Sequence, residues 1–288
     1  MQLFMQVLVS GLLMGGVYCL ITIGLSLTFG VMKIMNFAHG EFLMLCMYAV
    51  YYMFYYFGID PYIMAFVLTP IMFGVGIIAY RFFVRPIVDK NGNYQMLYMI
   101  GLQFFVQNLA LAIFSPNPRI VKASMSDLSF KVNGVFFDAT KLVAGAVSII
   151  ATLAFFYIMQ RTDLGRKIRA AAQDKEAASA HGVNVDRINH LAFGIGTACV
   201  AIAAALLAPI FQIEPTISSY FTTPCFVAVV LGGLGSFAGA AMGAYIVGLS
   251  MEMGNLLLGG SLGPALPFMI FILVLLFKPE GLWGVKER

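Results

Sequence analysis

The sequence predicts an all-α, polytopic helical membrane protein with about eight transmembrane helices and one short broken or re-entrant segment. Hydrophobic residues form 61% of the 288-residue chain and charged residues only 10%, compared with roughly 25% charged residues in ordinary soluble domains. So few charges cannot cover a soluble protein of 31.4 kDa, which excludes soluble enzymes, nucleic-acid-binding domains and disordered chains. The apolar runs are continuous over about 20 residues, as membrane-crossing helices require, whereas a β-barrel would alternate apolar and polar residues.

Eight long apolar segments are expected to cross the membrane as helices. They span residues 3–30, 43–57, 62–82, 94–114, 140–160, 189–210, 236–258 and 264–278. A ninth run, 222–232, begins around Pro224 and ends at the glycines Gly232, Gly233 and Gly235. No low-complexity linker or soluble insertion separates these segments, so residues 1–288 are expected to form a single transmembrane domain.

The basic residues predict which helix ends share a side of the membrane. Three lie in 81–90, six in 161–187 and three in 278–288, and such clusters favour the cytoplasm. An even number of crossings must therefore connect 188 to the tail, which makes the short ninth run a crossing or part of a broken helix. The same count places Ser115–Asp138 outside, together with the N-terminus if the first segment crosses once.

Enzymatic motifs are missing from the sequence. The four cysteines are single and scattered in apolar sequence, which predicts neither a disulfide nor a metal site. No GxxxxGK[ST] loop occurs, so the chain is not expected to hold ATP phosphates itself. No GxSxG, HExxH or kinase motif occurs either. We therefore expect no catalytic residue, metal or cofactor in this chain.

The polar stretch between the fifth and sixth long segments is predicted to form a protruding helical unit. Thr162 or Asp163 can cap a helix that runs to Gly182, which is placed to end it in the left-handed conformation. A second short helix is expected from Asn184 or Asp186. The alanine-rich composition would let a partner approach closely, although an ordinary amphipathic loop is the alternative.

The end of this helix, residues 176–182, has the sequence EAASAHG and thus an EAAxxxG spacing. The spacing resembles the loop by which permeases of ATP-binding-cassette (ABC) importers dock into a cleft of their ATPase subunit. Its place between two membrane segments, on the predicted cytoplasmic side, agrees with that function. The residues expected to couple to an ATPase are Gly165, Arg166, Arg169, Glu176, Ala177, Ala178 and Gly182.

A second polar group lies beside the first two apolar segments, where Lys33, Asn36, His39 and Glu41 occur close together. Ionisable side chains at membrane depth are costly and usually line a cavity or pair with each other, and Lys33 and Glu41 are candidates for such a pair. Two interpretations stay open. One is a re-entrant turn whose polar groups satisfy broken backbone; the other is a pathway or gating role for Asn36, His39, Gly40 and Glu41.

The third feature is a glycine spacing near the C-terminus. Gly235, Gly239 and Gly243 recur every four residues and are predicted to share one helix face, where small residues let another transmembrane helix approach closely. This ridge fits packing within the subunit or a mobile contact beside a pathway. Glu252, in the same span, is expected either to have a buried partner or to lie near the outer end.

Taken together, the chain resembles the permease subunits of bacterial branched-chain amino-acid ABC importers over nearly its whole length. Four stretches carry the resemblance in the same order along the chain: 11–48, 162–187, 229–244 and 275–284. The resemblance implies a multi-pass protein of the bacterial cytoplasmic (inner) membrane. It also implies a translocation pathway for leucine, isoleucine and valine, which an external substrate-binding protein delivers.

The resemblance further implies partners: a second homologous permease subunit and two ABC ATPase subunits, which use the ATP. The surrounding partner is the lipid bilayer, and no nucleic acid is expected. Relatives with similar motifs carry urea, short amides or other amino acids, so those substrates are alternatives. An ion-coupled secondary transporter and an intramembrane enzyme using His39 and Glu41 are the alternatives from other classes.

Overall fold

The computed structural model describes residues 2–126, 128–132, 135–259 and 262–284, and within them the chain is mostly helical. The helices are α1 (Gln2–Met32), α2 (His39–Phe57), α3 (Pro61–Ala79), α4 (Gly92–Phe114), α5 (Ala139–Arg161), α6 (Asp163–Gln173), α7 (Lys175–Ala180), α8 (Val185–Leu207), α9 (Ile217–Gly232), α10 (Phe237–Leu258) and α11 (Ala265–Phe277). The predicted all-α membrane fold class is confirmed.

Two details of this architecture were not predicted from the sequence. An antiparallel hairpin of β1 (Ser129–Val132) and β2 (Val135–Asp138) precedes α5. At its other end, α3 continues into a π-helical turn, Tyr80–Val84, and a 3₁₀ turn, Arg85–Ile87. The hairpin lies within the stretch Ser115–Asp138 that was expected outside, and the two turns overlap the basic stretch 81–90.

Polar side chains set the beginnings of most of the long helices. Asp60 accepts a hydrogen bond from the backbone N–H of Tyr62 at 2.9 Å, and Pro61 follows it as the first residue of α3, where its missing N–H leaves no bond unmade. The side chains that cap α4, α5, α8 and α10 in the same manner belong to Asn91, Asp138, Asn184 and Ser236.

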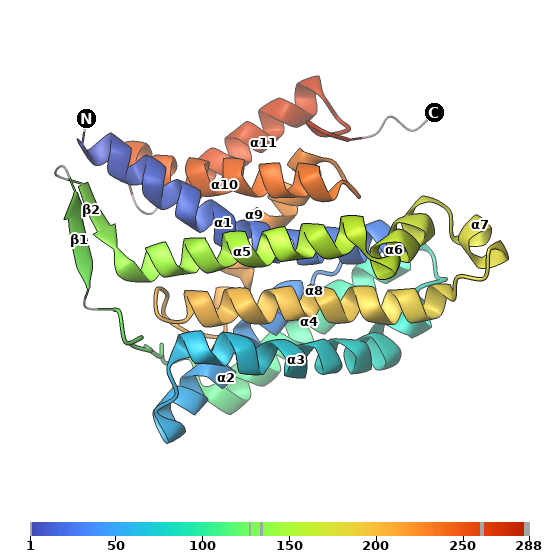
Figure 1. Ribbon diagram of the computed structural model, residues 1–288, viewed down its shortest axis with the longest axis horizontal. Helices are drawn as coiled ribbons and strands as arrows, with labels where there is room; N and C mark the ends of the chain where they lie inside the picture. Colours follow the sequence, from blue (N-terminus) through green and yellow to red (C-terminus); the bar gives the residue numbers. More distant parts are fainter. Residues whose placement is uncertain (1, 127, 133–134, 260–261, 285–288) are drawn as a thin grey trace.

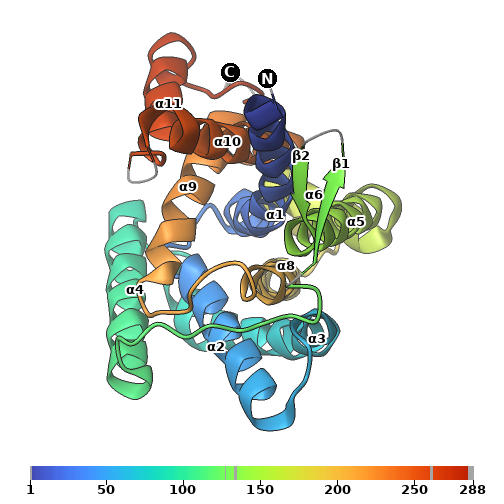
Figure 2. The same ribbon diagram turned by 90° about the vertical axis from the view of Figure 1, so that its left-hand side faces the viewer.

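The long helices run roughly side by side, with the β-hairpin and the N-terminus at one end and α6 and α7 at the other (Figure 1). Viewed along this direction, α8 lies near the centre of the bundle and α4 at its edge (Figure 2). Accordingly, α1 and α8 are the most buried of the candidate membrane spans and α4 is the least buried. The docking sequence predicted above therefore leads directly into a central helix.

Six helices in the described part of the chain are long and apolar enough to cross a membrane. They are α1, α3 with its extension to Ile87, α4, α5, α8 and α10. The apolar helices α9 and α11 are shorter. The ninth apolar run is longer than predicted, since α9 starts at Ile217 and contains Pro224 in its interior. Gly233 and Gly235, with φ of 103° and 84°, form the turn that follows it.

The basic stretches 81–90 and 161–187 lie at the same end of the bundle, as the charge pattern predicted. Direct evidence is the ion pair of Arg85 Nη2 with Asp186 Oδ2 at 3.2 Å. The hairpin stretch and the N-terminus lie at the opposite end (Figure 1). Lys286 and Arg288 of the tail lie outside the described residues.

Close backbone approaches hold α1, α3 and α8 together. A Cβ atom built on Gly24 of α1 would lie 2.8 Å from the carbonyl oxygen of Gly196 in α8. On the other side of α8, the Thr197 hydroxyl lies 2.9 Å from the carbonyl oxygen of Met72 in α3. Because lipid supplies little hydrophobic force between helices, such contacts depend on small residues and short polar bridges.

Candidate functional site

The predicted ATPase-coupling unit forms a compact protrusion between α5 and α8. Thr162 caps α6, its hydroxyl oxygen accepting from the Gly165 N–H at 3.2 Å, so of the two predicted caps the threonine is used. Gly165 is buried against the last turn of α5, and a Cβ atom there would lie 2.6 Å from the carbonyl oxygen of Ile158. A residue with a side chain at 165 would therefore push α6 away from α5.

The single helix expected over residues 163–182 is wrong, because it is broken at Asp174. The Asp174 side chain accepts from the backbone N–H groups of Glu176 and Ala177, both at 2.9 Å, and so starts a new helix, α7. Aspartate competes for neighbouring backbone in this way, and the chain changes direction between α6 and α7.

Helix α7 presents a small exposed surface. Glu176 and Ala177 are exposed, whereas Ala178 is 5% exposed and packs inward. Ala178 thus anchors α7 on the bundle, while Glu176 and Ala177 form part of a small exposed face. A partner surface can approach such a face closely.

Gly182 ends α7 as predicted, in the left-handed conformation with φ 80°. The Gly182 N–H donates to Ser179 O at 2.9 Å and the Val183 N–H to Ala178 O at 3.0 Å, the pair of bonds that defines a Schellman motif. Asn184 then caps α8. The second short helix predicted here is instead the first part of the 23-residue span α8.

The two arginines of the coupling prediction have different surroundings. Arg166 is exposed and pairs with Asp163 one helical turn earlier. Arg169 is half-buried, and its Nη1 atom has no hydrogen-bond partner among the described residues. The buried face of α6, formed by Ile168 and Ala171, holds the helix on the bundle.

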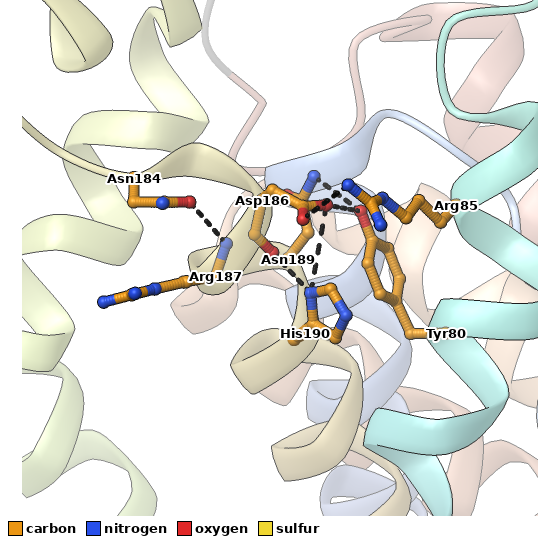
Figure 3. Close-up of polar contacts among 7 residues, drawn as sticks. All are labelled: Tyr80, Arg85, Asn184, Asp186, Arg187, Asn189 and His190. Atoms are coloured by element: carbon orange, nitrogen blue, oxygen red, sulfur yellow. Dashed lines mark hydrogen bonds and ion pairs between the residues drawn. The ribbon is translucent and has the colours of Figure 1, made fainter.

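A polar cluster that the sequence did not predict joins this unit to the end of α3 (Figure 3). We name it the Asp186 cluster; it consists of Tyr80, Arg85, Asp186, Asn189 and His190. The Tyr80 hydroxyl donates to Asp186 Oδ1 at 3.2 Å and accepts from Asn189 Nδ2 at 3.1 Å. The His190 ring packs edge-on against Tyr80 with centroids 4.4 Å apart. Asp186 was considered only as a helix start, since its partners are distant in sequence.

The second predicted site, Asn36–Glu41, lies deep in the bundle. His39 Nε2 donates to the carbonyl oxygen of Ile21 at 3.1 Å. Helix α1 runs on from Ile21 to Met32, about 16 Å at 1.5 Å per residue. The chain therefore turns back into the bundle after α1 and starts α2 at depth, in agreement with a re-entrant turn. Lys33 is exposed, and the expected Lys33–Glu41 pair does not form.

Gly40 lets this turn contact α9 closely, because a Cβ atom there would lie 2.7 Å from Ser218 O and 3.1 Å from Thr222 Cβ. Asn36 and Glu41 are each 2% exposed. Among the described residues, the Asn36 amide has no hydrogen-bond partner. The Glu41 carboxylate interacts with the Ser218 side chain of α9, although no hydrogen bond of normal length and angle forms. Buried polar groups without partners are costly, and intramembrane carboxylates typically mark substrate or ion pathways.

The glycine ridge is partly different from the prediction. Gly239 and Gly243 share the face of α10 that packs on α9, where Cβ atoms would lie 2.9 Å from the Gly232 carbonyl carbon and 3.1 Å from that of Ala228. The prediction that Gly235 belongs to this face is wrong. Gly235 lies before α10, in the Gly233–Gly235 turn, and has open space around it. The contact is within the subunit.

Glu252 has a partner, which the sequence left open. Its Oε1 lies 3.3 Å from the Lys141 ammonium of α5 and accepts from the Ser10 hydroxyl of α1 at 2.9 Å. Lys141 also donates to Ser10 at 2.8 Å. The triad ties α1, α5 and α10 at the end of the bundle that carries the hairpin. Among the described residues, no three His, Cys, Asp or Glu side chains are grouped as metal ligands.

A family model described as the permease component of branched-chain amino acid transport systems matches residues 7–276. The chain belongs to this permease family. It is 31% identical to the high-affinity branched-chain amino acid transport system permease protein BraD of Pseudomonas aeruginosa, over 99% of this chain and 97% of the relative. It is 30% identical to the corresponding LivH protein of Escherichia coli, over 99% and 96% of the two chains. A probable LivH of Methanocaldococcus jannaschii is 24% identical over 98% and 93%. No solved structure matches significantly.

The four stretches that carried the resemblance meet in pairs in this permease. The tail stretch binds the end of α9, where the N–H groups of Leu282 and Trp283 donate to Leu231 O at 2.8 Å and Gly232 O at 3.1 Å. The coupling stretch meets the end of α1, where Lys175 Nζ donates to Met32 O at 3.3 Å.

Lys175 is the residue of α7 that reaches into the bundle. Burial lowers the pKa of its ammonium group; the positive charge of Lys33 lowers it further, whereas Asp89 opposes the shift. Through its bond to Met32, α7 touches the chain immediately before it turns toward Asn36.

Proposed function

We propose that this permease is a membrane-embedded, non-catalytic subunit of an ATP-driven importer in the bacterial cytoplasmic membrane. It would form the translocation pathway for branched-chain amino acids that an external binding protein delivers. Its assembly would contain a second homologous permease and two ABC ATPase subunits, which bind and use the ATP. The observation that carries the proposal is the α6–α7 unit: a protruding helix pair with an EAAxxxG sequence, held at the base of a central span.

The residues of the coupling prediction support docking in different ways. Gly165 sets α6 against α5, Asp174 and Gly182 set the two ends of α7, and the exposed Glu176 and Ala177 remain for contact. The Nη1 atom of Arg169 is buried and has no partner among the described residues, so it would bind a docked carboxylate or carbonyl group only after the side chain turns outward. An ordinary amphipathic loop would not require defined residues, such as Asp174 and Gly182, at both ends of a short helix.

For the pathway, we propose the turn Asn36–Glu41. The buried Asn36 amide has no partner, and the buried Glu41 carboxylate has only a weak contact with Ser218, so a second state of the protein, or a substrate, that provides hydrogen bonds would be favoured. The zwitterionic head of an amino acid offers both an ammonium donor for Glu41 and a carboxylate acceptor for the Asn36 amide. Gly40 keeps this turn against α9, so movement of α9 would alter access to it.

The decisive experiment is affinity purification of the tagged permease from the membrane, followed by reconstitution. We expect two ATPase subunits and a second permease to co-purify, and ATP-dependent leucine uptake in proteoliposomes when binding protein is added outside. Excess isoleucine or valine should compete, and urea should not. Gradient-driven uptake without ATPase subunits would favour a secondary transporter and contradict the proposal.

A variant tests the docking surface itself. Ala177→Arg places a long charged side chain on the exposed face of α7 and should strongly reduce the co-purified ATPase. Asn93→Arg is the matched control, because residue 93 is exposed at the start of α4, at the same end of the bundle, outside the docking unit. Equal ATPase recovery from the two variants would place the docking surface elsewhere.

A further inference from the structure

The Asp186 cluster lies where the docking unit becomes a membrane span. Only the four residues 181–184 separate α7 from α8, whose first turn contains Asp186. Any displacement of α7 therefore acts first on this turn. Asp186 is also the residue there whose carboxylate bonds across to another span, through Tyr80 Oη at 3.2 Å and Arg85 Nη2 at 3.2 Å.

The cluster combines an exposed ion pair with a buried hydrogen bond: the Asp186 and Arg85 side chains are 43% and 55% exposed. Tyr80 is 1% exposed and Asn189 is 3% exposed, so water does not compete for their hydrogen bond. The Tyr80 hydroxyl is shared between two residues of α8, Asp186 and Asn189, which lie on one face of that helix. Hydrogen bonds that involve a charged group are stronger than neutral ones. Tyr80 is thus held to α8 at two points.

The end of α3, which carries Tyr80 and Arg85, has an irregular helical backbone. Tyr80–Val84 forms a π-helical turn at the end of α3, and such single turns inside helices are frequent at functional sites. Between this turn and the docking unit lies a hollow of about 330 Å³, bounded in part by Asp89 and Lys175. The end of α3 therefore has both a deformable backbone and space on the side of the docking unit.

We propose that the Asp186 cluster is the link through which movement of the docking unit reaches α3, with Asp186 as the positioning residue. The proposal rests on the ATPase-docking function proposed above. Farther along the two helices, the Thr197 hydroxyl donates to the Met72 carbonyl oxygen at 2.9 Å and connects α8 to α3 there as well. The Asp186 cluster connects α3 to α8 at their cytoplasmic ends, so a displacement of α7 would move both helices.

The structure offers one competing route, which the test must separate. Lys175 Nζ contacts Met32 O at 3.3 Å and connects α7 to the end of α1. If coupling runs through α1, removal of the lysine ammonium would matter and removal of the Asp186 charge would not.

The experiment measures leucine molecules transported per ATP hydrolysed by the reconstituted importer, normalised to assembled complex. We expect Asp186→Asn and Tyr80→Phe each to lower this ratio while ATP hydrolysis continues. For Asp186→Asn the loss should be about two- to fivefold, because the Asp186 side chain is 43% exposed and solvent weakens its charged contacts. The double variant should be little worse than Asp186→Asn, since residues of one network are not additive. Asp186→Glu, which keeps a carboxylate, should restore part of the coupling.

Lys90→Gln is the control for loss of an exposed charge near the same helix end, because Lys90 is exposed and is not part of the cluster; its ratio should equal that of the wild type. A wild-type ratio for Asp186→Asn overturns the proposal, and a loss of coupling in Lys175→Met alone assigns the route to α1. If Asp186→Asn does not assemble, Tyr80→Phe decides, because it removes one hydroxyl and keeps the ring packed. Absence of ATPase subunits from the wild-type preparation would instead contradict the proposed function.

Discussion

Gly239 is the residue at which the packing of α10 on α9 can be perturbed most directly. A Cβ atom at this position would lie 2.9 Å from the Gly232 carbonyl carbon and closer still to its oxygen. Ordinary contact begins at 3.4 Å, so alanine already requires a separation of at least 0.5 Å (3.4 minus 2.9), and leucine requires more. The obstructing atoms are backbone, so no side-chain rotation relieves the overlap.

The displacement also reaches the tail, because Gly232 O accepts the N–H of Trp283 at 3.1 Å. Overpacking a tight contact costs about 1–3 kcal/mol, which changes an equilibrium roughly 5- to 150-fold. An assembled transporter tolerates such a cost, whereas an equilibrium between conformations that differ by a few kcal/mol shifts with it. We therefore expect Gly239→Leu to lower leucine uptake by roughly 5- to 150-fold and Gly239→Ala to lower it less, with assembly mostly intact.

The assay is ATP-dependent leucine uptake by proteoliposomes, divided by the amount of assembled complex. Gly101→Leu is the matched control, because Gly101 lies inside α4 with no atom within 4 Å of its added Cβ. Gly259 also has open space, but its φ of 84° would strain any side chain, so it makes a poorer control than a helical glycine.

Two results would refute this reasoning. Equal uptake by Gly239→Leu and Gly101→Leu would mean that the α9–α10 contact does not take part in transport. Loss of the assembled complex in Gly239→Leu, with normal uptake per remaining complex, would mean that the glycines serve folding alone.

The remaining predictions concern the docking unit and the topology. Gly182→Leu should strain the left-handed turn by about 1–2 kcal/mol and lower the leucine transported per ATP with normal membrane insertion; normal uptake would contradict the docking assignment. Gly165→Val should push α6 off α5 and reduce co-purified ATPase, and unchanged recovery would show that α6 needs no close approach. In a cysteine-free background, Ser126→Cys should be labelled from the external side; labelling only from the cytoplasm would overturn the topology.

Several site features are local in sequence, and the sequence alone predicted them. The end of α7 depends on Gly182 and its immediate neighbours, and the starts of α6 and α8 depend on the caps Thr162 and Asn184. The break at Asp174 was missed although its signal is also local, because an aspartate two residues before a glutamate can start a helix as well as continue one. Gly235 was misplaced because a period of four residues does not show where a helix begins.

Composition and charge pattern by themselves determined the membrane fold class and the shared side of the basic stretches, and the resemblance of four short stretches to known permeases indicated the family. They did so because hydrophobic length, charge distribution and short motifs are properties of neighbouring residues. Only the tertiary structure decided that Tyr80 meets Asp186, that Glu252 meets Lys141, and that Glu41 does not meet Lys33. The first two pairs join residues 106 and 111 positions apart, and the third depends on the chain turning back into the bundle after α1. Such contacts depend on how helices pack, which no local pattern encodes.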